Sequence, residues 1–158
     1  IFWQIVNSFR GVVIVVNKWD LIDKNHQTMA EYEEAIREKI SPFTDVPILF
    51  TSNLTKQRIL KAFEMAMKVN ENRGRKISTS KLNDFLLPLI EHQPPPMYKG
   101  KMVRIKYVTQ IPSQTPTFAF YCNLPQYVKD PYKRFLENNI RQAYDLTGVT
   151  IRLFFREK

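Results

Sequence analysis

Val12-Val13-Ile14-Val15-Val16 is followed at once by Asn17-Lys18-Trp19-Asp20, and this stretch decides the fold of the first half of the chain. Five consecutive β-branched residues are typical of a strand that is buried on both faces of a parallel sheet. A second apolar run, Ile48-Leu49-Phe50, stands between two segments whose apolar residues have helical spacing, 28–40 and 59–70. The order β-α-β-α predicts an α/β layer.

The polar residues after the first strand carry groups that suit recognition of a purine base. A parallel strand delivers the residues that follow it to the carboxyl edge of its sheet, where open α/β folds bind ligands. The carboxylate of Asp20 can accept two N–H groups at once, as guanine presents and adenine does not. The amide of Asn17 can donate to a ring nitrogen, and the apolar stem of Lys18 can lie across a base or sugar. Because an acceptor left unpaired by the wrong base costs free energy, this loop predicts a guanine-reading site.

Asn17-Lys18-x-Asp20 after a hydrophobic strand resembles the guanine-specificity motif of the P-loop GTPases. In that family a second loop, after the next strand, supplies Ser-Ala-x, and the equivalent stretch here is 51–55. Ser52 matches that pattern and Asn53 departs from it, but the family uses the backbone amide at this position for the base carbonyl. The resemblance implies guanine-binding roles for Asn17, Lys18, Asp20, Ser52 and Asn53.

The sequence lacks the parts of a GTPase that hold phosphates and magnesium. A Gly-rich loop ending in Lys-Ser/Thr is absent, since glycine stands only at positions 11, 74, 100 and 148. The one Asp-x-x-Gly, 145–148, follows a predicted helix and is interpreted as a helix stop. We expect no catalytic residue here, no GTP hydrolysis by this chain alone, and no bound nucleotide or magnesium. With Cys122 as the single cysteine and only two histidines, no metal site is expected either.

A second unit is predicted beyond a polar stretch near residue 74. Helical spacing over 78–90, ahead of three prolines, predicts a helix. Alternation over 102–109 and 117–123 predicts neighbouring antiparallel strands, and alternation over 150–156 predicts a third. An amphipathic segment, 131–146, predicts a second helix with Asp130 as its N-cap. The order α-β-β-α-β indicates an α+β unit with a three-stranded sheet and helices on one face.

Positive charge is concentrated in this second unit. The chain carries 24 Lys and Arg against 15 Asp and Glu, a net charge of +9. Residues 77–158 hold 12 of the basic and 6 of the acidic side chains, so their net charge is +6. Alternation places Tyr107 on the helix-covered face. The opposite, outer face mixes cations with aromatic rings, as single-stranded RNA platforms do, and is expected to comprise Arg104, Lys106, Val108, Ala119, Tyr121, Arg152, Phe154 and Arg156. An alternative with equal weight is that this outer face docks on a neighbouring GTP-binding domain (G domain).

Longer stretches resemble the C-terminal part of the tandem-domain bacterial GTPase family EngA, also called Der. They are Val16–Leu21, Ile77–Asn83, Pro94–Pro96, Lys99–Lys101, Tyr132–Asn138 and Ile151–Leu153. The resemblance covers nearly the whole chain. It implies an α/β partial P-loop GTPase domain at 1–72, a linker at 73–77 and an α+β KH-like domain at 78–158, which lacks the Gly-x-x-Gly of standard KH domains.

The same resemblance implies a parent protein with two consecutive G domains, and the single cysteine, which fits a reducing cytosol, leads us to expect a cytoplasmic location. That parent would bind GTP or GDP with magnesium, hydrolyse GTP, and act in assembly of the large ribosomal subunit through contacts of the KH-like domain with ribosomal RNA or with its own G domains. Neither a membrane nor DNA is an expected partner. The apolar start, Ile1–Phe9, is interpreted as the tail of a helix from a missing upstream half. The alternative is a free-standing RNA-binding or protein-interaction module with no nucleotide function.

Overall fold

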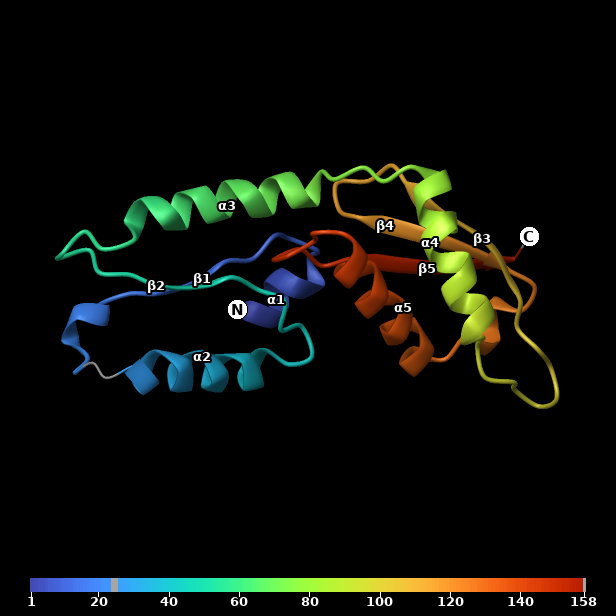
Figure 1. Cartoon of the computed structure of the whole chain (residues 1–158), viewed down its shortest axis with the longest axis horizontal. Helices are drawn as coiled ribbons and strands as arrows, with labels where there is room; N and C mark the ends of the chain where they lie inside the picture. Colours follow the sequence, from blue (N-terminus) through green and yellow to red (C-terminus); the bar gives the residue numbers. More distant parts are fainter. Residues whose placement is uncertain (24–25, 158) are drawn as a thin grey trace. The chain divides into compact units, whose positions relative to one another are not determined.

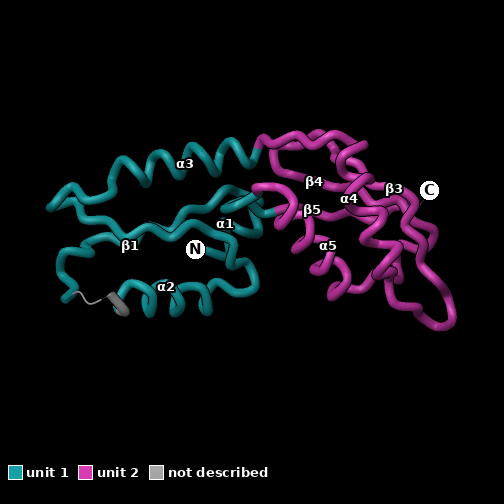
Figure 2. The backbone as a smooth tube through the Cα atoms, in the orientation of Figure 1, with its two compact units in different colours: residues 1–73, 146–150 teal, residues 74–145, 151–158 magenta. Residues whose placement is uncertain are grey.

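The computed structural model describes residues 1–23 and 26–157 (Figure 1). The chain forms two compact units, shown in different colours in Figure 2. Unit 1 comprises Ile1–Arg73 and Leu146–Thr150, and unit 2 comprises Gly74–Asp145 and Ile151–Lys158. Within the described residues, no helix is both long enough and apolar enough to cross a membrane.

Unit 1 is built on two parallel strands with helices around them. Its elements are α1 (Phe2–Asn7), β1 (Ile14–Val16), the 3-10 turn η1 (Trp19–Leu21), α2 (His26–Ile40), β2 (Ile48–Phe50) and α3 (Ile59–Arg73). β1 pairs with β2 in parallel, and Figure 1 shows α2 and α3 on opposite sides of the strand pair. The predicted order β-α-β-α is confirmed, although α2 begins two residues before the expected start at residue 28 and α3 extends past residue 70.

The core of unit 1 lies between α1, β1 and α2. Its buried residues are Val12, Ile40, Phe43 and Val46, against which Phe2, Ile5, Val6, Ile14 and Ile36 pack. The ring of Phe2 lies 6.3 Å from that of Phe43, centroid to centroid. Phe2, Ile5 and Val6 therefore belong to this core, because a short helix brings their side chains onto one face, whereas Ile1 and Trp3 stay exposed.

A short segment from late in the sequence completes unit 1. Gly148 O accepts a hydrogen bond from Val12 N at 2.7 Å, and Gly148 N donates to Asp45 O at 2.8 Å. Leu146 and Val149 are buried there. The sequence predicted one continuous second unit, but these five residues join the first, since alternation and helical spacing identify apolar residues without saying which core receives them.

Unit 2 contains a three-stranded sheet and two long helices. Its elements are α4 (Thr79–His92), β3 (Ile105–Ile111), β4 (Thr117–Cys122), the 3-10 turn η2 (Pro125–Tyr127), α5 (Asp130–Ala143) and β5 (Arg152–Glu157). The strand order is β3-β4-β5, with β3 antiparallel and β5 parallel to the central β4. The predicted order α-β-β-α-β and the antiparallel first pair are confirmed.

The two helices of unit 2 lie antiparallel to each other. Tyr132, near the start of α5, donates its hydroxyl to Gln93 O at 2.8 Å, just past the end of α4. Tyr144, just past the end of α5, donates to Lys81 O at 3.1 Å, in the first turn of α4. Lys129 is the N-cap of α5, so the expected cap, Asp130, lies in the first turn instead. A carboxylate there still favours the helix through the macrodipole.

Side-chain amides fasten α4 and the preceding linker to the edge of β3. Asn83 accepts from Val108 N and donates to Val108 O, both at 2.8 Å. Gln110 accepts from Ile77 N at 2.7 Å and donates to Arg75 O at 2.8 Å. These bonds satisfy backbone groups that an edge strand would otherwise expose. They also fix where α4 begins relative to the sheet.

Candidate functional site

Backbone hydrogen bonds join the loop after β1 to the loop after β2. Trp19 N donates to Thr51 O at 3.0 Å, and Thr51 N donates to Val16 O at 2.8 Å. Lys18 turns the chain with φ 60°, the left-handed region that few non-glycine residues adopt. The ring of Trp19 is buried beneath the loop, with its centroid 4.4 Å from that of Phe50. The buried indole and the strand ends therefore hold the loop in one conformation.

Ser52 holds the carboxylate of Asp20. Its hydroxyl donates to Asp20 Oδ1 and accepts from Thr55 N at 3.2 Å. Ser52 N donates to Gln57 O, also at 3.2 Å, and Ser52 is fully buried. The bond uses one carboxylate oxygen and fixes the plane of the group, so Asp20 is oriented before any ligand arrives. Such preorganisation lowers the entropy cost of binding.

The two loops enclose one pocket of about 480 Å³. It is lined by Asn17, Lys18, Asp20, Leu21, Asn53 and Leu54. Four of the five predicted guanine-binding residues are in its wall, and Ser52 lies behind Asp20. Sequence reasoning missed Leu21 and Leu54, which are 74% and 82% exposed. The only feature of the sequence that could have indicated them is that each directly follows a predicted guanine-binding residue. Amides, a carboxylate, an ammonium and apolar flanks suit a flat heterocycle with polar edges.

A β-bulge changes the composition of the outer face of the three-stranded sheet. The pairing register shifts by one between Ile105 and Tyr107, so Lys106 is an extra residue in β3. An extra residue reverses the alternation of side chains beyond it. Tyr107 therefore lies on the outer face, and Val108 is fully buried on the helix-covered face. The prediction was wrong for both residues because alternation alone gives no sign of a bulge.

The corrected outer face carries aromatic rings beside basic side chains. Tyr107 and Tyr121 stack with centroids 4.4 Å apart and an interplanar angle of 13°. Arg156 is the β5 partner of Tyr121. The guanidinium carbon of Arg152 lies 5.5 Å from the ring centroid of Phe154, which is 40% exposed. The register thus places the predicted residues of β4 and β5 on one face, together with a tyrosine that the sequence assigned to the other.

Arg104 and Lys106 lie at the entry to β3, and both are exposed. The backbone N–H of Arg104 donates to the side-chain oxygen Oδ1 of Asn123 at 2.8 Å. The side-chain nitrogen Nδ2 of Asn123 donates in turn to Met102 O at 3.1 Å. Asn123 therefore ties the entry of β3 to the end of β4. Because Lys106 is the bulged residue, strand alternation does not dictate its direction.

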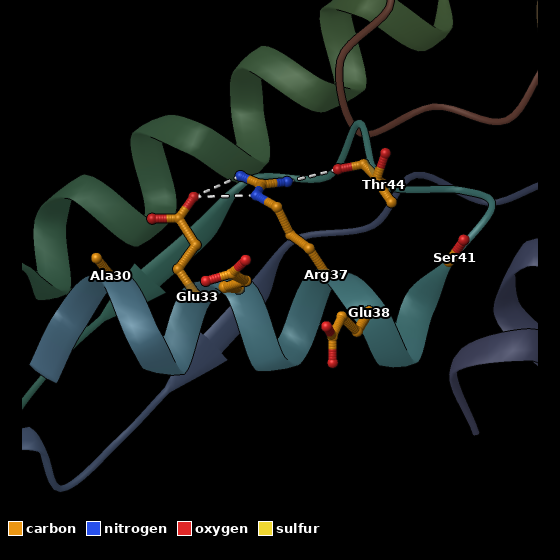
Figure 3. A pocket seen from close by; sticks show the side chains of 7 residues that line it. Ala30, Glu33, Arg37, Glu38, Ser41 and Thr44 are labelled. Atoms are coloured by element: carbon orange, nitrogen blue, oxygen red, sulfur yellow. Dashed lines mark hydrogen bonds and ion pairs between the residues drawn. The ribbon is translucent and has the colours of Figure 1, made fainter.

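A further hollow of about 480 Å³ lies along α2. Figure 3 shows Arg37 reaching from it to Glu33 and to the backbone of Thr44. The guanidinium donates to Glu33 Oε1 at 2.6 Å through Nη2 and to Thr44 O at 2.5 Å through Nη1. These contacts attach α2 to the loop that follows it. Glu33 is therefore part of an ion pair, which explains this surface without acid–base chemistry.

Cys122 is fully buried in β4. Burial raises the pKa of its thiol, so it behaves as a small apolar residue rather than a nucleophile. Across residues 1–23 and 26–157, no group of three or more His, Cys, Asp or Glu side chains is arranged to hold a metal ion.

Comparison with known proteins identifies the family. Residues 76–156 match the family described as the KH-domain-like region of EngA bacterial GTPase enzymes, C-terminal. The chain belongs to the EngA family of bacterial GTPases. The resemblance seen in the sequence is thereby confirmed, and the matched KH-like region covers most of unit 2 together with residues 146–150 of unit 1.

Relatives named GTPase Der match the chain over its whole length. Those from Christiangramia forsetii and Flavobacterium johnsoniae are 60% and 58% identical over 158 residues, and one from Bacteroides fragilis is 56% identical over 160. Each alignment covers 100% of this chain. The chain spans only 36% of the first two EngA relatives and 37% of the third.

Proposed function

We propose that this chain supplies the guanine-reading half of a G domain and the KH-like unit of a protein that binds and hydrolyses GTP. The observation that carries this proposal is the pocket after β1, where a serine holds Asp20 beside Asn17, Lys18 and Asn53. The carboxylate would accept the two N–H groups of guanine, Asn17 would donate to the ring, and the stem of Lys18 would cover the base. Discrimination follows because adenine would leave the carboxylate unpaired.

The proposed G domain also accounts for the exposed apolar face of unit 1. Val15 of β1 is 47% exposed, and Phe63 and Met67 of α3 are each 66% exposed. A monomeric surface rarely leaves such residues together. We propose that further strands of a P-loop domain cover them in the intact protein. Those strands would bring the phosphate and magnesium contacts, which the residues of this chain do not supply.

Calorimetric titration of GDP and ADP into the intact protein tests the guanine site. Asp20→Ala should weaken GDP binding by roughly a hundredfold or more, because the donors of guanine would lose their acceptor. Asp23→Ala is the matched control, since Asp23 is a nearby exposed carboxylate outside the pocket lining. GDP binding that is equal in the two variants would contradict the proposal, as would equal binding of ADP and GDP by the unmodified protein.

We further propose that the outer face of unit 2 contacts ribosomal RNA during assembly of the large subunit in the cytoplasm. The observation in its favour is the stacked pair Tyr107 and Tyr121 beside Arg156, which combines aromatic surface with positive charge. The second candidate is docking of this face on a G domain, with Phe154 as its apolar contact. Tyr121→Leu should weaken RNA binding in the first case, and binding to an isolated G domain in the second.

A further inference from the structure

A two-residue hairpin between α4 and β3 forms a basic tip. Tyr98 N donates to Lys101 O at 3.0 Å, and Lys101 N donates to Tyr98 O at 2.9 Å. The two residues between them, Lys99 and Gly100, have φ of 49° and 71°. Positive φ at both central residues is the requirement of the tight turn that suits two-residue hairpins. The segment is the yellow loop beyond the C-terminal end of α4 in Figure 1.

Three lysines gather around two tyrosine rings at this tip. The rings of Tyr98 and Tyr127 lie 4.9 Å apart, centroid to centroid. The ammonium nitrogen of Lys129 is 4.2 Å from the centroid of Tyr98, and that of Lys99 is 5.6 Å from it. The ammonium nitrogen of Lys101 is 5.8 Å from the centroid of Tyr127. We call these five residues the lysine–tyrosine cluster. Cation–π attraction concentrates three positive charges on a small surface.

The charges of the cluster are not neutralised by carboxylates. All three lysines are exposed, and within residues 1–23 and 26–157 none of their ammonium groups forms an ion pair with an acidic side chain. The acidic neighbour in sequence, Asp130, is bound by Lys133 Nζ at 2.9 Å. That hydrogen bond lowers the pKa of Asp130, with a further contribution from the charges of Lys133, Arg134 and Lys129. The local balance remains positive.

We propose that the lysine–tyrosine cluster binds the phosphate backbone of single-stranded RNA. This inference rests on the proposed contact of unit 2 with RNA and gives that unit a second contact surface. The rings are engaged by each other and by the lysines, so the cluster offers charge rather than open faces for bases. It should therefore bind without sequence preference.

RNA is favoured over a lipid surface or an acidic protein by the composition of the cluster. Its aromatic residues are tyrosines, whose hydroxyls can also donate to phosphate oxygens. Lysines on a rigid turn suit a regularly spaced row of phosphates. A peripheral membrane site would instead be expected on an amphipathic helix with a continuous apolar face.

The salt dependence of RNA binding by the full 158-residue chain tests the proposal. The probe is a fluorescein-labelled oligouridine of about 20 nucleotides, which exceeds the length of a typical single-stranded site. The test variant is Lys99→Gln, Lys101→Gln and Lys129→Gln together. If three phosphate contacts are lost, the slope of log K against log salt should become shallower by about 2, with binding roughly tenfold weaker at low salt.

Two variants serve as controls. Lys39→Gln, Lys61→Gln and Lys68→Gln in unit 1 remove the same total charge away from the cluster and should leave the slope within error of the unmodified chain. Replacing the three cluster lysines with arginine keeps the positive charge, so this variant should have the slope of the unmodified chain. If the lysine stems had only a structural role, the arginine variant would not need to recover the slope.

The outcomes separate this inference from the function on which it rests. If the glutamine variant keeps the original slope while Tyr121→Leu weakens binding, RNA contact stands and the cluster proposal is overturned. If the unmodified chain does not bind the oligonucleotide, both are overturned. Loss of binding to phosphatidylserine vesicles in the cluster variant, with RNA binding unchanged, would assign the cluster to a membrane surface instead.

Discussion

Unit 2 buries the apolar side chains of its helices, whereas unit 1 leaves a row of them exposed. Leu82, Leu86, Leu136 and Ile140, from α4 and α5, are completely buried. In α3 of unit 1, Leu60 is 78% exposed and Phe63 is 66% exposed. Burial of apolar area is the main favourable term in folding. Unit 2 thus has a well-buried core, and unit 1 has an apolar surface that the proposed further strands of a P-loop domain would cover.

The polar groups of the two units differ in the same way. In unit 1, Asp20 is fixed by a buried serine, so one carboxylate in one orientation can read one base. In unit 2, Lys99, Lys101, Lys129 and Arg152 are exposed and lie against aromatic rings, which suits a partner recognised by charge. The difference supports the selective base recognition proposed for unit 1 and the electrostatic RNA contact proposed for unit 2.

The largest expected effect tests how far unit 1 depends on the segment at Gly148. A Cβ there would lie 2.5 Å from Val69 Cγ2 and 2.8 Å from Val12 O, at φ +75°. Gly148→Ala should lower the free energy of unfolding of unit 1 by about 4 kcal/mol, from backbone strain and overpacking combined. Both tryptophans, Trp3 and Trp19, are in unit 1, so tryptophan fluorescence in urea follows that unit.

Gly100 in unit 2 is the matched control for this substitution. Its φ is +71°, but a Cβ there would meet no atom within 4 Å. Gly100→Ala should therefore cost only about 1 kcal/mol, from the left-handed conformation alone. Equal losses at the two glycines would show that strain, and not the crowded contact with α3, decides the effect.

The contrast in burial predicts unequal costs of truncation. Leu136→Ala should destabilise unit 2 by about 3 kcal/mol, because the fully buried side chain would leave a cavity. Phe63→Ala in α3 should cost less than about 1 kcal/mol in this chain, since the ring is mostly exposed. Amide hydrogen exchange in α5 and tryptophan fluorescence measure the two units separately. A large loss of stability in Phe63→Ala would contradict the predicted difference between the two units.

A pH-dependent contribution is expected in unit 2 from Tyr132. Burial raises the pKa of its hydroxyl to about 12, above the ordinary value of about 10. The unfolded chain then loses this proton first, so stability is complete below about pH 10 and falls as pH rises to 12, by about 2 kcal/mol. Tyr132→Phe keeps the ring without the proton. The free energy of unfolding of Tyr132→Phe should approach that of the unmodified chain as pH rises. If the two plots of this free energy against pH stay parallel from pH 9 to 12, the prediction is contradicted.

The smallest expected effects concern one helix ion pair in each unit. The side chains of Arg37 and Glu33 in unit 1 are 38% and 41% exposed, and those of Arg141 and Glu137 in unit 2 are 11% and 34% exposed. Glu137→Gln should cost about 1 kcal/mol and Glu33→Gln about 0.3 kcal/mol, because solvent screens the more exposed pair. Urea unfolding at low and high salt measures both costs, and high salt should weaken the effect of Glu33→Gln proportionally more than that of Glu137→Gln.

The sequence was sufficient for the order of the main helices and strands and for four of the six residues that line the pocket. The β-branched run before Asn17 predicted a parallel strand, which is confirmed, but its predicted burial on both faces was wrong, since Val15 is 47% exposed. The rule that ligands bind at the carboxyl ends of strands placed Asp20 near the next loop. Both rest on local periodicity and on the direction of a strand. That guanine occupies the pocket stays a prediction, and so does the RNA contact.

The failures share one physical cause, which is that pairing is not a local property. Tyr107 and Val108 exchanged faces because β3 carries one more residue than β4 can pair. Residues 146–150 joined unit 1 because hydrogen bonds to Val12 and Asp45, more than a hundred positions earlier in the chain, determine where they pack. A one-dimensional pattern contains neither piece of information.

The sequence by itself determined the α/β and α+β classes, the family resemblance and the loop that carries Asp20. The tertiary structure decided that Ser52 holds this carboxylate, that the outer face includes Tyr107, and that Tyr98, Tyr127 and three lysines form one cluster. The physical reason is that propensity and periodicity act within a few residues. The bulge in β3, the Ser52–Asp20 hydrogen bond and the contact of Tyr98 with Tyr127 form only where separate segments meet.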